Sequence, residues 1–165
     1  MKAAMLIFAF ALCFTAAGAA TRAEDADVAF PEGYRSWYFD HSSALMPGHT
    51  PEIEIGIANV YANPLAVDGL RTGIYADGAV FAIDRLKFAE QDNHVLAEGD
   101  RVVVVVMQRD AKRFADTGGW GFEGFLGGDP NKRLVKDKMK DGGKGCFGCH
   151  APLVKDSFVF THLHP

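Results

Sequence analysis

Cysteine is scarce in this chain, with 3 residues in 165, and basic residues are outnumbered by acidic ones, 17 to 21. No dense stripe of Lys and Arg occurs, and no internal repeat or low-complexity segment stands out. Nucleic-acid binding requires a clustered positive surface, so we exclude a nucleic-acid partner. The length is that of one ordinary globular domain.

A hydrophobic run long enough to cross a bilayer is also missing. The main apolar stretch, residues 3–17, has about 15 residues, against the roughly 20 that a spanning helix needs. It follows Met1-Lys2 and leads into small residues, which is the layout of a secretory signal. We predict a signal peptide over residues 1–23 and a single domain over residues 24–165, with no membrane anchor after cleavage.

Two cysteines, Cys146 and Cys149, stand three positions apart and are followed directly by His150. This C-x-x-C-H spacing predicts covalent attachment of one haem c. Two thiols so spaced can add to the two vinyl groups on one edge of the porphyrin, and the adjacent imidazole then reaches the iron from one face. We expect Cys146 and Cys149 to bind the haem and His150 to be the proximal iron ligand.

Three other interpretations of this motif stay open: a redox-active cysteine pair, a zinc site and a plain disulfide. A thioredoxin-like pair opens a helix after a strand of a βαβ unit, whereas this pair follows the glycine-rich residues 141–145. A zinc site lacks further cysteines, although His162 and His164 could complete one. Bacteria attach c-type haem outside the cytoplasm, so the motif and the signal peptide together predict a periplasmic protein.

Five segments have the composition of β-strands. Residues 52–61 alternate isoleucine with small or polar residues, and residues 101–107 contain five consecutive valines. Such a valine run is expected where both faces of a sheet are covered. Turns are predicted at Asp77-Gly78 and Gly99-Asp100, before the second and third strands. The other strands are predicted at residues 79–86, 118–125 and 157–162.

Short helices are predicted between these strands. Proline, asparagine and aspartate at their starts are typical of helix N-termini. The predicted ranges are 30–39, 63–73, 111–115 and 129–142. Strands with intervening short helices indicate an α+β fold, which excludes the all-helical small cytochromes c and the four-helix cytochromes c′.

Several short motifs lie in a specific order along the mature chain. They are Phe30-Pro31-x-x-Tyr34-Arg35-x-Trp37, Val60-Tyr61-x-Asn63-Pro64, Asp77-Gly78-Ala79-Val80, Asp110-Ala111-Lys112-Arg113-Phe114-Ala115, Trp120-x-Phe122, the haem motif and Val159-Phe160-Thr161. With these motifs the sequence resembles the cytochrome P-460 and cytochrome c′-beta superfamily over most of the mature chain. The resemblance implies a mainly antiparallel β-sheet with short helices, a c-type haem packed on the sheet, and a homodimer.

The resemblance to cytochromes P-460 breaks at three polar positions. In those enzymes, which oxidise hydroxylamine, a lysine after the Asp-Gly turn is bonded to the porphyrin; the match puts Ile83 there. An arginine and a carboxylate of the same enzymes fall on Ala58 and Val105. Hydroxylamine oxidation must release protons, and a distal base or hydrogen-bonding group is the usual device for moving them. The sequence therefore looks closer to cytochrome c′-beta.

The resemblance thus implies an apolar distal haem face, which would favour small uncharged ligands such as NO and CO. The side chains expected on it are Ala58, Phe81, Ile83, Val103 and Val105. Ordinary core packing is the competing interpretation of these residues.

Four further residues have two interpretations each. Met107 is a possible distal iron ligand, but methionine is more often a packed core residue. Glu54 shares the Ala58 side of its strand and could reach the haem edge. Arg85 and Lys87 could pair with haem propionates, but solvation at the surface is the simpler role.

Three functions follow from these alternatives. A mono-haem cytochrome that binds or detoxifies NO is favoured by the apolar replacements. A hydroxylamine or NO oxidoreductase that works without the lysine bond is the second, so the sequence leaves open whether the protein is an enzyme. The third is an electron carrier with His150 and Met107 both on the iron. The redox partner is unknown in every case.

Overall fold

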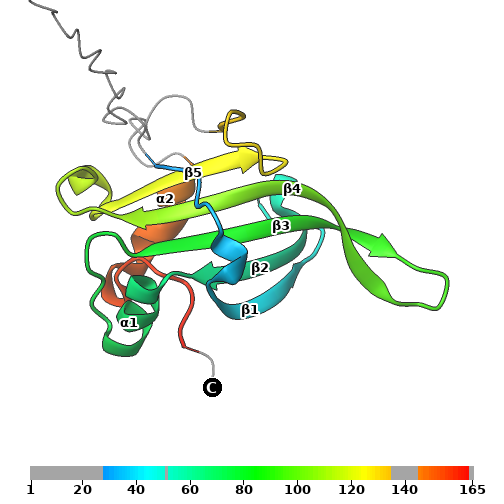
Figure 1. The fold of residues 1–165 in the computed structure, drawn as a ribbon, viewed down its shortest axis with the longest axis horizontal. Coiled ribbons are helices and arrows are strands. Elements are labelled where there is room, and N and C mark those ends of the chain that lie inside the picture. Colours follow the sequence, from blue (N-terminus) through cyan, green and yellow to red (C-terminus); the bar gives the residue numbers. More distant parts are fainter. Residues whose placement is uncertain (1–27, 51, 135–144, 164–165) are drawn as a thin grey trace, which may run out of the picture.

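The computed structural model describes residues 28–50, 52–134 and 145–163. At its centre is a five-stranded antiparallel sheet in which each strand pairs with its neighbour in sequence (Figure 1). The strands are Tyr38–Leu45 (β1), Gly56–Ala62 (β2), Val80–Glu90 (β3), Leu96–Arg109 (β4) and Trp120–Leu126 (β5). Two short helices accompany the sheet, α1 (Pro64–Thr72) and α2 (Cys146–His150). The predicted α+β fold with a mainly antiparallel sheet is confirmed.

Helix α1 forms where the sequence predicts it. The Asn63 side chain caps its N-terminus by accepting a hydrogen bond from the backbone N–H of Ala66 at 2.9 Å. Pro64 occupies the first turn, where a missing N–H costs nothing. Gly73 ends the helix with φ of 76°, a left-handed conformation that favours glycine. Asn63 also donates to the carbonyl oxygen of Gly78 at 2.8 Å, which ties α1 to the start of β3.

The hairpin of β3 and β4 is longer than predicted, and its tip projects beyond the other strands (Figure 1). The chain reverses between Gln91 and Val95, where the Gln91 N–H donates to the Val95 carbonyl at 2.9 Å. The predicted turn at Gly99-Asp100 is therefore wrong, because both residues lie within β4. A Cβ atom on Gly99 would stand 3.2 Å from the Lys87 carbonyl oxygen, and the β3–β4 register shifts nearby. The glycine marks an irregular strand pairing instead of a turn.

Two predictions near the N-terminus are corrected. The helix expected over residues 30–39 is only a 3-10 turn, Tyr34–Ser36, because Tyr38 onward pairs with β2. The strand expected over residues 52–61 begins at Gly56, after a second 3-10 turn at Glu52–Glu54. A Cβ atom on Gly56 would lie 2.0 Å from the carbonyl oxygen of Leu86, so the strand can start there only with glycine.

Three predictions in the second half are also corrected. Asp110 accepts hydrogen bonds from the next turn as predicted, but residues 111–114 form turns and a 3-10 helix, Ala115–Thr117, follows in place of an α-helix. Residues 129–134 are a turn followed by a bridge between Arg133 and Phe125, and the rest of the helix predicted over 129–142 lies outside the described residues. Residues 157–162 are not a strand, since no neighbouring strand pairs with them in the described structure.

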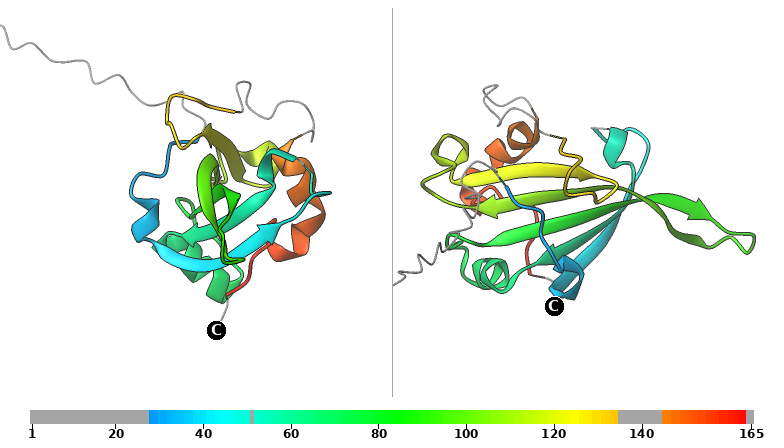
Figure 2. Two further views of the ribbon diagram at one scale, coloured as in Figure 1. Left: turned by 90° about the vertical axis from the view of Figure 1, so that its right-hand side faces the viewer. Right: turned by 45° about the horizontal axis from the view of Figure 1, so that its top comes forward.

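Different segments cover the two faces of the sheet. Residues 28–37 lie on one face and α2 on the other (Figure 2). Because side chains alternate along a strand, Val104 and Val106 of β4 pack under the N-terminal segment, whereas Met107 packs on the α2 side. The valine run is therefore covered on both sides, as predicted.

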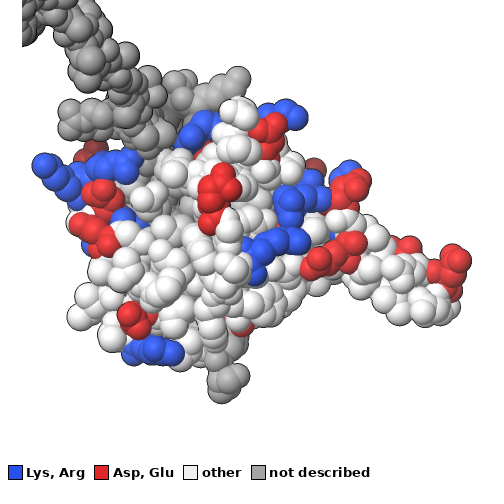
Figure 3. Space-filling model, viewed as in Figure 1, with Lys and Arg blue, Asp and Glu red and all other residues white. Residues whose placement is uncertain are grey.

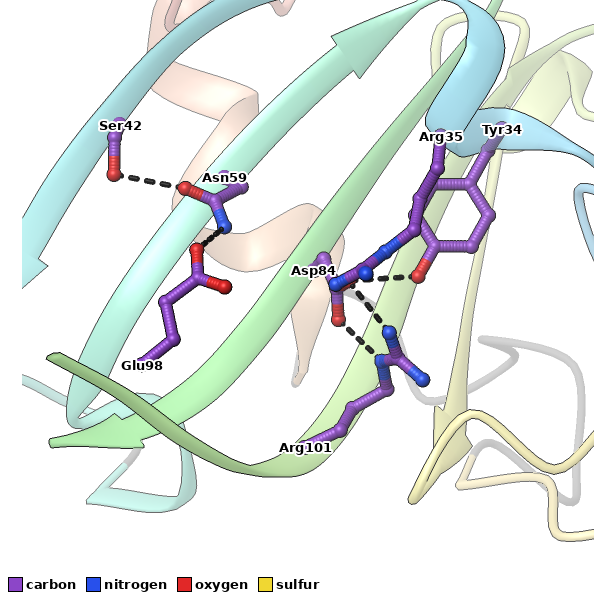
Figure 4. Close-up of polar contacts among 7 residues, drawn as sticks. All are labelled: Tyr34, Arg35, Ser42, Asn59, Asp84, Glu98 and Arg101. Atoms are coloured by element: carbon purple, nitrogen blue, oxygen red, sulfur yellow. Dashed lines mark hydrogen bonds and ion pairs between the residues drawn. The ribbon is translucent and has the colours of Figure 1, made fainter. Parts of the chain in front are cut away.

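A buried polar cluster holds residues 28–37 against the sheet (Figure 4). Asp84 of β3 is completely buried and accepts hydrogen bonds from the Tyr34 hydroxyl at 2.8 Å, Arg35 at 2.7 Å and Arg101 at 2.6 Å. Burial alone would raise the pKa of Asp84, but the hydrogen bonds from Arg101, Tyr34 and Arg35 outweigh it and lower the pKa. Burial and the bond to Asp84 raise the pKa of Tyr34 to about 12.

Charges of both signs are interspersed on the side that carries residues 28–37, around a largely uncharged centre (Figure 3). The projecting hairpin has acidic side chains toward its tip (Figure 3). Among the described residues, no helix is both long and apolar enough to cross a membrane.

Candidate functional site

The C-x-x-C-H motif forms the short helix α2 and continues into a 3-10 helix, Ala151–Asp156. Gly145 precedes it with φ of 103°, a conformation that favours glycine. Residues three apart on a helix lie on the same side, so the thiols of Cys146 and Cys149 face one direction. Both thiols are free. This local structure suits two thioether bonds to one edge of a porphyrin.

Helix α2 lies on the apolar face of the sheet. Cys146 and Phe147 pack against a buried cluster that includes Phe81, Met107 and Phe122. Burial is the main cause that raises the pKa of the Cys146 thiol, and the charge of a nearby carboxylate adds to it. Reactive redox cysteines require a lowered thiol pKa, so this environment disfavours a thioredoxin-like pair.

The imidazole of His150 is held in one orientation. Its Nδ1 atom lies 2.7 Å from the carbonyl oxygen of Phe158. A carbonyl can only accept, so Nδ1 carries the proton and Nε2 keeps the lone pair that binds iron. The rings of Phe122 and Phe160 flank the imidazole, each with its centroid 4.7 Å away. Burial lowers the pKa of His150, which favours the neutral imidazole that a metal requires.

The Phe158 carbonyl is positioned by an unusual turn. Ser157 and Phe158 both have positive φ, 54° and 67°, and the Phe158 N–H donates to the Leu153 carbonyl at 2.8 Å. The Trp120 indole fixes the same turn by donating to the Ser157 carbonyl at 2.9 Å. A Cβ atom on Gly118 would lie 2.3 Å from the Phe158 ring. Trp120 and Gly118 therefore support the histidine from β5 and the loop before it.

The described residues provide no set of ligands for the alternative of a zinc site. In the part of the chain that the structure describes, no three His, Cys, Asp or Glu side chains gather where they could hold a metal ion. His164, one of the histidines considered for such a site, lies outside the described residues.

The sheet places all the predicted distal residues on the face that α2 covers. Antiparallel partners share a face, and the register pairs Ile83 with both Val60 and Val105. The neighbouring pairings on this face are Phe81 with Met107, and Arg85 with Ala58 and Val103. Ile83 and Phe81 belong to the same apolar cluster as Cys146. The roles of these side chains toward a haem stay predictions.

Burial divides this face into two parts. Ala58, Phe81 and Val103 are at most 2% exposed, which is typical of core residues. Ile83 and Val105 are only half-buried, so they are the predicted distal residues with surface left to contact a ligand. Met107 is 4% exposed and packs beside Phe81 in the core cluster.

Arg85 was the residue that sequence reasoning misjudged. Its side chain is only 15% exposed, and Nη2 donates to Oε2 of Glu54 at 2.8 Å. The simpler surface role expected for Arg85 is therefore wrong, whereas Lys87 is exposed as expected. The alternation of Phe81, Ile83 and Arg85 along the strand is the sequence signal that places the arginine on the face that α2 covers.

These residues fit a haem. Cys146, Cys149 and the Nε2 atom of His150 would supply the attachment and the iron ligand, and Ile83 and Val105 would supply apolar contact surface. A haem also carries two carboxylates, and Arg85 is a half-buried cation whose Nε atom is buried without a hydrogen-bond partner among the described residues.

The chain was compared with known protein families and with curated proteins. No curated protein matches it. The family described as Cytochrome P460 matches residues 31–161, a range that contains the whole sheet, both helices and the C-x-x-C-H motif. The chain therefore belongs to the Cytochrome P460 family, and its implied cofactor is haem.

Proposed function

We propose that the protein is a periplasmic mono-haem cytochrome of the c′-beta type that binds NO and CO on the sheet side of its haem. The haem would be attached through Cys146 and Cys149, with His150 as proximal ligand. The observation that carries the proposal is the combination of an oriented, neutral His150 with a sheet face on which the apolar side chains of Ile83 and Val105 are half-buried.

When bound, the haem would supply an iron that can bind a diatomic gas, and His150 is the residue that would hold that iron. The protein's own residues would orient the His150 imidazole and provide an apolar surface for the ligand. The Phe158 carbonyl and the rings of Phe122 and Phe160 keep the imidazole from rotating. Ile83 and Val105 have no group that donates or accepts a proton, so a neutral ligand that needs no proton transfer is favoured.

The test is the absorption spectrum of the purified holoprotein, oxidised and dithionite-reduced, before and after CO and NO. High-spin iron that binds both gases is expected. A low-spin spectrum that does not respond to CO would overturn gas binding and favour Met107 as the sixth ligand. Intact mass should show one haem with two thioether additions, and a Cys146→Ser/Cys149→Ser variant should release its haem on acid extraction.

The half-buried Arg85–Glu54 pair favours a second candidate, an oxidoreductase acting on hydroxylamine or NO. Polar groups beside the iron could move the protons that hydroxylamine oxidation releases. Rapid oxidation of hydroxylamine by the wild-type holoprotein would establish this candidate over simple gas binding. Turnover no faster than that of a haem peptide would exclude it.

Export and dimerisation belong to the same proposal. The signal-like residues 1–23 support export to the periplasm, and the family resemblance supports a homodimer. N-terminal sequencing of protein recovered from the periplasm should begin near Glu24. Light scattering of the mature holoprotein should give twice the mass of one chain.

A further inference from the structure

Arg85 is a charged residue on the sheet face that α2 covers, and its neighbours there are apolar. It follows Ile83 by two positions on β3, so both side chains point toward the α2 side. Its cross-strand partners are Ala58 and Val103. Ala58 and Val103 are at most 2% exposed, so both cross-strand neighbours of Arg85 on this face are buried.

Glu54 holds this arginine from a different segment. It belongs to the 3-10 turn before β2, and its carboxylate is 2.8 Å from Arg85 Nη2 and 3.7 Å from His49 Nε2. One carboxylate therefore contacts both the guanidinium of Arg85 and the imidazole of His49.

One donor of Arg85 is unused. Its Nε atom is buried and, among the described residues, has no hydrogen-bond partner. A buried charged donor without a partner is costly, and such groups in native proteins usually have a functional partner. The ion pair with Glu54 engages Nη2, so the Nε–H is left for an acceptor outside the described residues.

We propose that Arg85, positioned by Glu54, is the hydrogen-bond donor of the ligand side of the haem, and that it lets the ferric protein bind small anions such as azide and nitrite. This inference rests on the proposed haem site and adds a second ligand class to the neutral gases. A guanidinium is suited to the task because it keeps its charge when buried. Neutral CO gains much less from the same donor.

The test compares Arg85→Met with Lys87→Met, which removes an exposed positive charge from the same strand. Ferric holoprotein of each is titrated with azide and with nitrite, and ferrous holoprotein with CO. Arg85→Met should weaken azide and nitrite binding by about tenfold or more, the typical effect of a charge-assisted hydrogen bond. Its CO affinity should change by less than about threefold, and Lys87→Met should resemble the wild type throughout.

Infrared spectra of the CO complexes provide an independent readout. A positive donor near the ligand oxygen strengthens back-donation from iron and lowers the C–O stretching frequency. The frequency should therefore rise in Arg85→Met and stay constant in Lys87→Met. A haem propionate is the alternative acceptor for Arg85. A contact between Arg85 and a propionate would change the midpoint potential of the haem but would change neither the anion affinity nor the C–O stretching frequency.

Unchanged azide affinity and C–O frequency in Arg85→Met would overturn the proposal, whatever happens to the potential. If Arg85→Met fails to retain haem, Arg85→Gln keeps the length of a polar side chain without its charge and should show the same loss of anion affinity. Failure of the underlying function looks different: the wild-type iron would then bind neither CO nor NO.

Discussion

His150 Nδ1 lies 2.7 Å from the carbonyl oxygen of Phe158, eight residues further along the chain. This backbone contact decides which imidazole nitrogen faces the haem space, and it exists because Ser157 and Phe158 both adopt positive φ. The imidazole that we propose as the proximal ligand is thereby oriented by a turn that Trp120 anchors to β5.

His150→Gly should keep the haem covalently attached through Cys146 and Cys149 but change its absorption spectrum, because the proximal ligand is lost. Adding free imidazole should restore most of the original spectrum, since the space left by the side chain is flanked by Phe122 and Phe160. His94→Gly is the control: His94 is exposed at the hairpin turn with φ of 62°, where glycine fits well. A His150→Gly spectrum identical to wild type would contradict the assignment.

Local signals made part of this fold predictable. Asn63-Pro64 and Gly73 bound α1 through hydrogen bonds and backbone angles that need only near neighbours. The same holds for β5, whose alternating glycines and aromatics mark it directly. Helix starts and strand periodicity are properties of short windows, so one sequence suffices to find them.

The parts of the fold that the sequence did not predict depend on pairing between strands that are distant in sequence. Tyr38–Leu45 reads as the end of a helix and a polar loop, yet it becomes β1 because β2 offers a strand edge to it. Gly99 resembles a turn residue but lies inside β4, opposite a register shift of β3. Such outcomes depend on which segments meet across the sheet, and tertiary context overrides local preference there.

In the candidate site, too, some features are visible in the sequence and others depend on tertiary contacts. The spacing of Cys146, Cys149 and His150 is visible in the sequence, but a backbone acceptor such as the Phe158 carbonyl has no sequence signature. Arg85 shares the period of Ile83, yet its burial depends on Glu54, which is 31 residues away. Because arginine is charged, the sequence alone predicted that Arg85 lies at the surface. The ion pair with Glu54 explains why its side chain is half-buried instead.

The Arg85–Glu54 pair predicts opposite shifts of the haem midpoint potential. Arg85→Met removes a positive charge, which stabilises ferric iron and lowers the potential, and Glu54→Gln removes a negative charge and raises it. A unit charge roughly 7 Å away, as a hydrogen bond to an iron-bound ligand would require, contributes about 2.4 kcal/mol at an effective dielectric constant of about 20, which is of the order of 100 mV for one electron. Spectroelectrochemistry measures both shifts. Shifts of the midpoint potential with the same sign in the two variants would show that the charges of Arg85 and Glu54 do not control the potential of the haem iron.

Asp84→Asn should destabilise the protein by roughly 2–4 kcal/mol at pH 7, because Arg35 and Arg101 would lose their buried counter-charge. The sign of the pH dependence follows from the lowered pKa of Asp84. The unfolded carboxyl binds protons at higher pH than the folded one, so the stabilisation is complete above about pH 4 and is lost as the pH falls further.

Urea denaturation from pH 7 to pH 3 would measure this effect, with Asp68→Asn as control. Asp68 forms an exposed pair with Arg71 at 3.6 Å, which is expected to contribute less than about 1 kcal/mol. The difference between wild type and Asp84→Asn should shrink below pH 4. A constant difference across the range would show that the ionised carboxylate is not what stabilises the cluster.

Met107 distinguishes a core side chain from an iron ligand. It is 4% exposed and packs with Phe81, Trp120 and Phe122, so Met107→Ala should lower the free energy of unfolding by about 2–4 kcal/mol. Met46→Ala is the control, because Met46 is 60% exposed and its truncation should cost less than about 0.5 kcal/mol. The spin state and CO affinity of Met107→Ala should match those of the wild type. A change from low-spin to high-spin iron would instead identify Met107 as the sixth ligand and make the protein an electron carrier, since a thioether on the iron would block the position that a gas must occupy.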